Sequence, residues 1–415
     1  MDRPDPATDD SLLAEAAARF GTPAYVYLTD RIAARLARIE AALGRWFQLS
    51  YAVKSNPNPA LLAWLNGRVP YLDVSSGGEL QTAMASGWQA ARASFTGPAK
   101  RDEELRMAIG AGLGELVVES LREARAASRI AQELGLRQDV LVRIAPDRVP
   151  KGFGDQMAGR PSPFGIDIEE APAALTEILA LPGLQVAGLH IYSGTQCLKA
   201  PAIVENWGIF IGIFRDLCAA HDLYPRRLVF GSGLGIPYHA GDMPLDLEEI
   251  AAAAAPALED LKADPRFAAT VPVLELGRYL VGEAGYFVTR VVSVKQSRGS
   301  RIAICDGGMN NHLAASGHFG MVLRRNYLMH RVGGGSEEEK LDISGPLCTS
   351  IDRLGSGVML PRVDEGDLIA IHASGAYGPT ASPVNFISHP PPREILAEGG
   401  QLADATPRTR AGVGD

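Results

Sequence analysis

Short apolar runs and amphipathic stretches alternate along most of the chain. Eight runs have the length and apolar content of buried strands, and the stretches between them space their apolar residues as helices do. The strand-like runs are Leu49–Val53, Tyr71–Val74, Ala93–Thr96, Leu116–Val118, Val140–Ile144, Gln185–Ile191, Arg227–Phe230 and Val271–Leu274. The helical stretches include Glu103–Ala111, Ser120–Leu134, Ala171–Leu181 and Trp207–His221. Such an alternation over roughly 240 residues predicts an α/β fold, a (β/α)8 TIM-type barrel. A doubly wound sheet is the competing interpretation, but the strand count and the missing early GxGxxG motif favour the barrel.

The two ends of the chain follow other patterns. Residues 1–10 predict a tail, Leu12–Phe20 a helix, Ala24–Leu28 a strand and Arg31–Leu43 an amphipathic helix. After about residue 282, strand-like runs follow one another with few helices, at Gly285–Ser293, Ile302–Cys305, Asp367–His372 and Phe386–Ile387. Gly333–Ser336 and Glu337–Lys340 indicate a flexible, charged hairpin or loop, and the chain after Glu398 indicates an extended, poorly packed end.

These patterns divide the chain into four expected parts. We expect a tail and helix over residues 1–20, a barrel over 21–282, a β domain over 283–395 and a flexible tail over 396–415. Residues 21–30 could instead join the β domain.

Composition narrows the class of protein. The 415 residues are 46% hydrophobic and carry a formal net charge of -8, which is ordinary for a globular protein and argues against a general nucleic-acid or anionic-membrane binder. There is no apolar stretch of about 18 residues and no signal-peptide pattern, so we expect a cytoplasmic protein. The four cysteines form no CxxC pair, so we expect neither a metal site nor a disulfide framework.

Polar residues gather at the carboxyl ends of the predicted barrel strands, where barrel enzymes carry their reactive groups. Lys54 follows one apolar run, and a desolvated lysine can form an imine with an aldehyde. An isolated lysine is more often a surface residue, so the neighbouring strand ends decide its interpretation. They supply Asp73, Ser76, Arg143, His190, Ser193, Glu275 and Arg278.

Two further strand-end features suit a phosphorylated pyridine cofactor. Gly231–Gly235 follows the strand at Arg227–Phe230, and such a loop can present backbone N–H groups to a phosphate, with Arg278 balancing its charge. If the cofactor is pyridoxal 5'-phosphate (PLP), Glu275 can keep the pyridine nitrogen protonated, which makes the ring an electron sink. The alternatives are a surface ion pair between Glu275 and Arg278 and a core role for His190.

Eight ordered segments carry a family resemblance over about residues 21–395. They are Tyr51–Asn56, Asp73–Leu80, His190–Gly194, Gly231–Gly235, Glu275–Arg278, Cys305–Asn310, Gly345–Cys348 and Gly375–Tyr377. Together they resemble the fold-type III PLP-dependent decarboxylases, the family of diaminopimelate and ornithine decarboxylases. The resemblance implies an alanine racemase-like architecture, with a barrel and a C-terminal β domain.

The resemblance also implies roles for matched residues. Lys54 would bind PLP covalently, His190 would stack on its ring, and Glu275 would pair with the pyridine nitrogen. Asp73 and Arg143 would lie near the lysine and the ring. The phosphate would be surrounded by Ser193, Gly233, Gly235, Gly277, Arg278 and Tyr377. Cys348 would come from the partner subunit of a homodimer with shared active sites and would help to protonate the carbanion.

The sequence departs from the family after the cysteine. Diaminopimelate and ornithine decarboxylases carry Glu or Asp there, which helps to place a distal cation, whereas this chain has Thr349, and Asp352 could compensate. The Asn311–Gly320 segment resembles a secondary-metabolism branch that includes the butirosin-pathway glutamyl-carrier-protein decarboxylase. Arg324 and Arg325 could face a carboxylate, a phosphopantetheine phosphate or an acidic carrier helix, and a solvated basic pair is the alternative.

We therefore expect a carboxy-lyase that acts on an acidic aminoacyl group tethered to an acyl carrier protein. A free diamino-acid decarboxylase, such as one for diaminopimelate, is the main alternative. A non-catalytic regulator on the same fold is disfavoured because both Lys54 and Cys348 are present, and a PLP racemase is disfavoured because the Cys348 segment matches the decarboxylases.

Overall fold

The structure is a computed structural model that describes residues 6–318 and 325–407. The chain forms two compact units. One unit comprises residues 36–236 and 243–279, and the other comprises residues 1–35, 237–242 and 280–415. The division falls inside the amphipathic helix α2 (Thr29–Leu43), which the sequence pattern predicted from Arg31.

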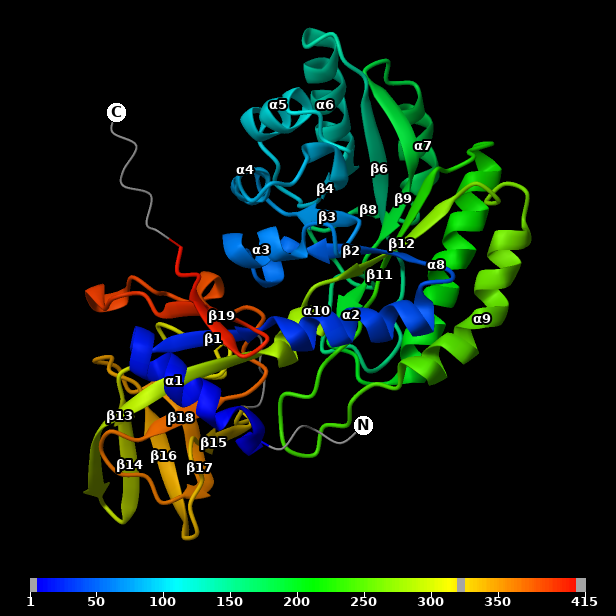
Figure 1. The fold of residues 1–415 in the computed structure, drawn as a ribbon. Coiled ribbons are helices and arrows are strands. Elements are labelled where there is room, and N and C mark those ends of the chain that lie inside the picture. Colours follow the sequence, from blue (N-terminus) through cyan, green and yellow to red (C-terminus); the bar gives the residue numbers. More distant parts are fainter. Residues whose placement is uncertain (1–5, 319–324, 408–415) are drawn as a thin grey trace. The chain divides into compact units, whose positions relative to one another are not determined.

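The first unit contains a closed barrel of eight parallel strands (Figure 1). Its strands are β2 (Gln48–Ala52), β3 (Tyr71–Val74), β4 (Ala93–Phe95), β5 (Glu115–Val118), β6 (Gln138–Ala145), β9 (Leu184–Ile191), β11 (Arg227–Gly231) and β12 (Val271–Leu276). Each strand pairs with the next in this order, and the pairing of β12 with β2 closes the ring. The barrel prediction is confirmed, and each of the eight predicted runs overlaps one of these strands, although several strands are one to three residues longer than predicted.

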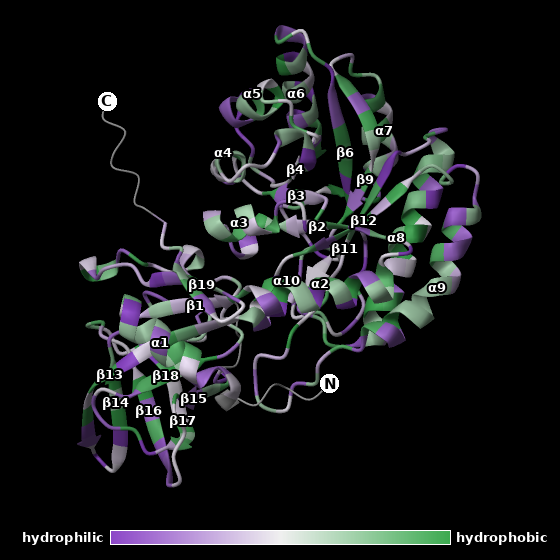
Figure 2. Cartoon of the chain, viewed as in Figure 1, coloured by the Kyte–Doolittle hydropathy of each residue, from purple (hydrophilic) through white to green (hydrophobic). Residues whose placement is uncertain are grey.

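The barrel strands alternate with helices whose first turns are fixed by local caps. Asn58, Ser76, Ser120 and Asp246 accept hydrogen bonds from first-turn N–H groups, as helix-start residues do. The helices are α3 (Pro59–Leu65), α4 (Gly77–Ala85), α5 (Asp102–Gly110), α6 (Leu121–Glu133), α7 (Ala171–Leu179), α8 (Ala200–Ala220) and α9 (Leu247–Ala263). Figure 2 shows hydrophobic and hydrophilic bands alternating along α9, because only one side of the helix is buried.

Apolar side chains fill the barrel and the space beneath its helices. Val117, Leu141, Ala187, Val229 and Val273 form one cluster, each from a different strand. A second group is aromatic, with Phe230 of β11 packed against Phe47, Phe210 and Phe214 at centroid distances of 5.2–6.1 Å. Full burial of one such side chain contributes about 1.5–3 kcal/mol, so this packing holds the strand ends in place.

The second unit is built on a nine-stranded sheet, and the prediction of a β domain is confirmed. Its strands are β1 (Ala24–Leu28), β13 (Gly285–Ser297), β14 (Ser300–Cys305), β15 (Met329–Arg331), β16 (Glu338–Ser344), β17 (Arg353–Pro361), β18 (Leu368–Ile371), β19 (Arg393–Glu398) and β20 (Gln401–Asp404). Strand β1 pairs with β13 and β19. Helix α1 (Asp10–Phe20) buries Leu13, Ala16 and Ala17 in the same core as Val26.

Three expectations about this unit are wrong. Phe386–Ile387 is not a strand but part of a 3-10 turn (Phe386–Ser388), in which Ile387 has φ 47°. The chain after Glu398 is not a loose end up to Asp404, because β19 and β20 form an antiparallel hairpin. Within residues 1–10, Pro6–Asp9 form a 3-10 turn and Asp10 begins α1, while residues 1–5 lie outside the described residues.

Two smaller expectations also need correction. The charged run predicted as a loop begins β16 at Glu338, because that strand pairs with β17 and leaves its charged side chains partly in solvent. Helix α8 begins at Ala200 and not at Trp207, with Pro201 in its first turn, where a proline needs no hydrogen-bond acceptor.

Candidate active site

Lys54 lies in a 3-10 turn, Val53–Ser55, directly after strand β2. Its Nζ atom lies 3.3 Å from Glu275 Oε1 of β12 and 3.5 Å from Asp73 Oδ2 of β3, the two strands that flank β2. The Lys54 side chain is 34% exposed, whereas both carboxylates are almost fully buried. The two buried carboxylates therefore hold the Lys54 amine in place, and a carbonyl compound can still reach it from solvent.

Glu275 is the member of this cluster whose pKa lies well below its usual value. Burial alone would raise the pKa of Glu275, but the charge of Lys54 and the hydrogen bond to His190 outweigh it and lower the pKa to about 2. The hydrogen bond joins Glu275 Oε2 to His190 Nε2 at 3.1 Å. A carboxylate that stays charged inside a barrel is able to keep a nearby basic ring nitrogen protonated.

Asp73 is the other carboxylate beside the lysine, and its environment has the opposite effect. Burial and the negative charge of Glu275 raise the pKa of Asp73, and the charge of Lys54 offsets this only in part. Asp73 Oδ1 accepts hydrogen bonds from the hydroxyl groups of Ser94 and Thr96, which fix its orientation. The two carboxylates therefore differ in acidity although they share one lysine.

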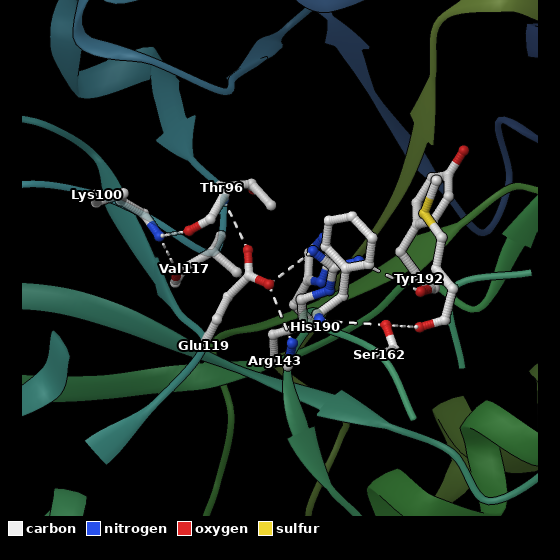
Figure 3. A network of polar contacts seen from close by, with 12 residues as sticks. Thr96, Lys100, Val117, Glu119, Arg143, Ser162, His190 and Tyr192 are labelled. Carbon is white, nitrogen blue, oxygen red and sulfur yellow. Dashed lines mark hydrogen bonds and ion pairs between the residues drawn. The ribbon is translucent and has the colours of Figure 1, made fainter. Parts of the chain in front are cut away.

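Arg143 of β6 is held by a carboxylate that sequence reasoning missed. Glu119 follows β5 directly and is buried. Its Oε2 accepts hydrogen bonds from Arg143 Nη1 at 2.9 Å and from the Gly165 N–H at 3.0 Å, and its Oε1 accepts from the Gly97 N–H at 2.7 Å (Figure 3). The strand-end rule that identified Lys54 would also have identified Glu119, because both residues follow a buried strand.

A buried ion pair supports Glu119 from the next loop. Lys100 Nζ lies 2.7 Å from Glu123. It also donates hydrogen bonds to the carbonyl groups of Gly97 and Val117 (Figure 3). These contacts tie the loop after β4 to the end of β5. Arg143 and His190 are register partners on the adjacent strands β6 and β9, so the network ends beside the Lys54 cluster.

The glycine loop after β11 lies beside the segment after β9. The Cys197 N–H donates to the Gly233 carbonyl and the Gly235 N–H donates to the Cys197 carbonyl. A side chain at Gly194 or Gly233 would collide with the ring of Phe153, and Gly233 has φ 70°. Among the described residues, the N–H groups of Gly233 and Leu234 have no acceptor. The loop therefore holds uncommitted donors close to Ser193, as an anion site requires.

Gly277 and Arg278 follow β12. A side-chain Cβ atom at Gly277 would lie 3.0 Å from Ser55 Cβ, so glycine lets this segment approach the Lys54 turn. Arg278 begins the short helix α10 (Arg278–Val281). Both residues belong to the same unit as Lys54.

The other residues with expected roles belong to the β-domain unit. Cys348 is exposed, in contrast to the buried Cys197, Cys218 and Cys305. Tyr377 has φ 53°, an unusual conformation for a non-glycine residue. Arg325 Nη2 bonds to Asp242 at 3.0 Å and to the Ala240 carbonyl. Arg324 lies outside the described residues.

The expectation that Asp352 contacts the substrate is not supported. Asp352 is 3% exposed, and its two oxygens accept hydrogen bonds from the N–H groups of Met309 and Leu347. Gly308 and Gly345 leave no room for a side chain beside this carboxylate. Asp352 therefore holds the Gly345–Cys348 loop in shape and does not present its charge outward. Thr349 is partly exposed.

The barrel unit has what a PLP site needs. The partly exposed Lys54 can react with the aldehyde of PLP, and the buried carboxylate of Glu275 suits its pyridine nitrogen. The N–H donors of the glycine loop suit its phosphate. Across residues 6–318 and 325–407, no group of three or more His, Cys, Asp or Glu side chains is arranged to hold a metal. The fold and these residues together define a barrel enzyme of the lysine-linked PLP class.

Comparison with known proteins gives the family. The family model described as pyridoxal-dependent decarboxylase, pyridoxal binding domain, matches residues 29–282. The L-glutamyl-(BtrI acyl-carrier protein) decarboxylase of Niallia circulans is 34% identical over 92% of this chain and 90% of its own length. A diaminopimelate decarboxylase of Methanothermobacter thermautotrophicus is 32% identical over 94% of this chain and 89% of its own. The crystal structure of diaminopimelate decarboxylase from M. jannaschii superposes with a TM-score of 0.86 at 28% identity, covering 95% of this chain and 91% of that one. The chain belongs to the PLP-dependent decarboxylases.

The protein is therefore a PLP-dependent carboxy-lyase, and its own residues can be assigned tasks. Bound PLP supplies an aldehyde for covalent attachment and a ring that accepts electrons when carbon dioxide leaves. With PLP bound, Lys54 would supply the amine, and Glu275 would hold a proton at the ring nitrogen, since its pKa is lowered to about 2. His190 is fixed by Glu275, and Asp73 orients the lysine through the contact at 3.5 Å. Among the described residues, no helix has the length and hydropathy required to cross a membrane.

Proposed function

We propose that the protein removes the α-carboxylate of an acidic aminoacyl group, of glutamyl or aspartyl type, carried on an acyl carrier protein in secondary metabolism. The observation that carries this proposal is the missing carboxylate after Cys348. Thr349 occupies the position where diamino-acid decarboxylases carry an acid that attracts a distal ammonium group. A substrate whose distal end is a neutral thioester needs no such acid.

The contacts of Asp352 support the same substrate class. Asp352 was the residue that could have replaced the missing acid, but both of its oxygens are committed to backbone N–H groups. Burial also raises the pKa of Asp352, which further reduces its value as a partner for a distal cation. Neither Thr349 nor Asp352 therefore offers a charge for the side chain of a diamino acid.

Similarity to named relatives points in the same direction. The relative named for a glutamyl group on a carrier protein is 34% identical to this chain over 390 residues. The relatives named diaminopimelate decarboxylase are 29–33% identical over similar lengths. Because these identities are close, diaminopimelate remains the second candidate substrate, and the experiment must separate the two.

A comparison of the turnover of three substrates tests this proposal. The holoenzyme is incubated with glutamyl-loaded carrier protein, with aspartyl-loaded carrier protein and with free diaminopimelate, and the mass loss of carbon dioxide is followed. We expect turnover on an acidic aminoacyl carrier and at most slow turnover of diaminopimelate. Rapid turnover of diaminopimelate with none on either carrier would contradict the proposal.

A charge at position 349 sharpens the test. We expect T349E to lower kcat/KM for the loaded carrier and to raise it for diaminopimelate, because the new acid attracts a distal ammonium. Ser350 is exposed one residue further along, so S350E adds the same charge and serves as the matched control. Equal effects of T349E and S350E would show that the charge acts only at long range.

Arg325 is our candidate for recognition of the carrier or its phosphopantetheine arm. Its side chain is 50% exposed, and Asp242 holds it from one side. We expect R325A to raise KM for the loaded carrier more than for a short thioester that lacks the carrier protein. Arg324 shares this proposed role as the neighbouring cation.

We also propose that the protein acts in the cytoplasm as a homodimer with shared active sites. Cys348 is exposed on its own unit, as expected for a thiol that acts in the site of a partner subunit. Mixing inactive K54A with inactive C348A protein tests this assignment. Recovery of activity in the mixture is expected, and a mixture that stays inactive while forming dimers would contradict it.

A further inference from the structure

Asn206 lies in helix α8 and contacts a residue of the proposed phosphate site. Asn206 and Ser193 are both 1% exposed, and the Ser193 hydroxyl donates to Asn206 Oδ1 over 2.8 Å. Among the described residues, the buried Asn206 Nδ2 has no hydrogen-bond partner. An unsatisfied buried amide is unfavourable, so this orientation of the Asn206 amide is one of two that must be considered.

The direction of this hydrogen bond matters for an anion. Phosphate oxygens accept hydrogen bonds, so a serine that binds phosphate must donate its single proton to it. With that proton directed at Asn206 Oδ1, Ser193 would present only lone pairs to the anion. The contact in its present direction therefore opposes phosphate binding by Ser193.

Ser193 nevertheless lies where an anion would be bound. The Met157 N–H donates to its carbonyl group, which fixes the backbone. The next residue, Gly194, packs on the same Phe153 ring as Gly233 of the glycine loop. The uncommitted N–H groups of Gly233 and Leu234 belong to that loop. Ser193 can thus complete a set of donors only if its proton is released from Asn206.

We infer that Asn206 is a positioning residue that makes Ser193 a hydrogen-bond donor to the phosphate of PLP. The oxygen and nitrogen of an amide are nearly equal in size, so a half-turn of the Asn206 side chain costs no space. After the turn, Nδ2 donates to Ser193 Oγ and the Ser193 proton points to the phosphate. The turn gives Nδ2 a partner in Ser193 Oγ and releases the hydroxyl proton for the phosphate, and it moves Oδ1 to the position that Nδ2 leaves.

This inference goes beyond the proposed function, because it concerns the cofactor and holds for any amino-acid substrate. It also separates Asn206 from a residue that merely packs α8 against the barrel. A packing residue would affect the stability of the apoprotein and the binding of any pyridoxal compound alike. Asn206 should instead act only through Ser193 and only on ligands that carry a phosphate.

A double-mutant cycle tests this role. Apoproteins of the wild type, S193A, N206L and S193A/N206L are titrated with PLP and with pyridoxal, which lacks the phosphate, and Kd is measured from the change in absorbance. Leucine has nearly the shape of asparagine, and N206A serves as the second variant if N206L does not fold. Thermal unfolding of each apoprotein checks that α8 is intact.

We expect S193A and N206L each to raise the Kd for PLP by roughly tenfold to 100-fold, the range for a hydrogen bond to a charged group. The double variant should bind PLP no worse than S193A, and pyridoxal binding should change in none of the variants. Multiplied effects in the double variant would overturn the inference, as would a loss of pyridoxal affinity equal to the loss of PLP affinity. An S193A variant that binds PLP as the wild type does would overturn it as well.

Discussion

Replacing Glu275 with glutamine should separate the electrostatic role of this residue from its role in packing. The substitution keeps the shape of the side chain and removes one buried negative charge. Glu275 Oε1 lies 3.3 Å from Lys54 Nζ, and unit charges at this distance interact by about 5 kcal/mol at an effective dielectric constant of ~20. Asp73 remains 3.5 Å from the amine in E275Q, so Lys54 keeps one carboxylate partner.

The larger loss concerns the ring nitrogen of PLP. The pKa of Glu275 is about 2, so the native residue is charged throughout the working pH range, whereas an amide never is. Removing one preorganised electrostatic partner typically lowers kcat by ~100-fold to 1000-fold. We expect E275Q to show a decrease of that size in kcat, with PLP still bound through Lys54. The assay is single-turnover release of carbon dioxide, combined with the absorbance spectrum of the bound cofactor.

Glu115 provides a matched control at the opposite end of the barrel strands. It begins β5 and pairs at 2.8 Å with Arg227, which begins β11, and both side chains are mostly buried. Catalytic groups of barrel enzymes lie at the carboxyl ends of the strands, so a charge pair at the opposite end serves stability rather than chemistry. E115Q should destabilise the fold by ~1–3 kcal/mol and leave kcat unchanged. Equal losses of kcat in E115Q and E275Q, or full activity of E275Q, would refute the reasoning.

Two further predictions follow from the glycine loop and from a buried histidine. A Cβ atom at Gly235 would lie 2.8 Å from the Cys197 carbonyl oxygen, so G235A should raise the Kd for PLP by about tenfold or more. The control variant is G212A, because a Cβ atom at Gly212 of α8 would meet no neighbour. We expect G212A to stabilise the protein by ~0.5–1 kcal/mol. Titrations with PLP and urea unfolding measure both effects, and unchanged PLP affinity in G235A would contradict the first. Burial lowers the pKa of His312 from 6.5 to about 3. Between pH 3 and pH 6.5 the unfolded chain therefore binds one proton more than the folded chain, so the free energy of unfolding falls as the pH drops below 6.5. The loss from this residue should reach about 2 kcal/mol at pH 5, and H312Q should remove it, which urea unfolding at pH 7 and pH 5 would show.

The barrel could be predicted from sequence because each of its strands is buried on both faces. Tyr71–Val74 is predicted to the residue, since three of its four residues are apolar and a capped helix begins three residues later at Gly77. The same logic failed for the edge of the β domain. Glu338–Lys340 begins a strand although these residues are charged, because only its pairing with β17 decides its conformation. Phe386–Ile387 is apolar but adopts a turn.

Some residues of the site can likewise be predicted from the local sequence, whereas others are brought to the site only by long-range contacts of the folded chain. Lys54, His190 and Glu275 each follow from a polar residue at the end of an apolar run. Asn206 could not be found in this way, because it lies in the middle of a helix and only the folded chain brings it to Ser193. Asp352 was expected to face a substrate, and only its two backbone hydrogen bonds show that its charge is already used.

The covalent attachment of PLP to Lys54 is the claim on which the account rests. Holoenzyme treated with borohydride fixes such a link, and mass spectrometry of its peptides then locates the added pyridoxyl group. Lys100 is the natural comparison, because it is a second lysine of the barrel unit but is buried and held by Glu123 and two carbonyl groups. We expect the pyridoxyl group on Lys54 alone, with no modified lysine in K54A. A pyridoxyl group on Lys100 or any other lysine of the active wild-type enzyme would contradict it.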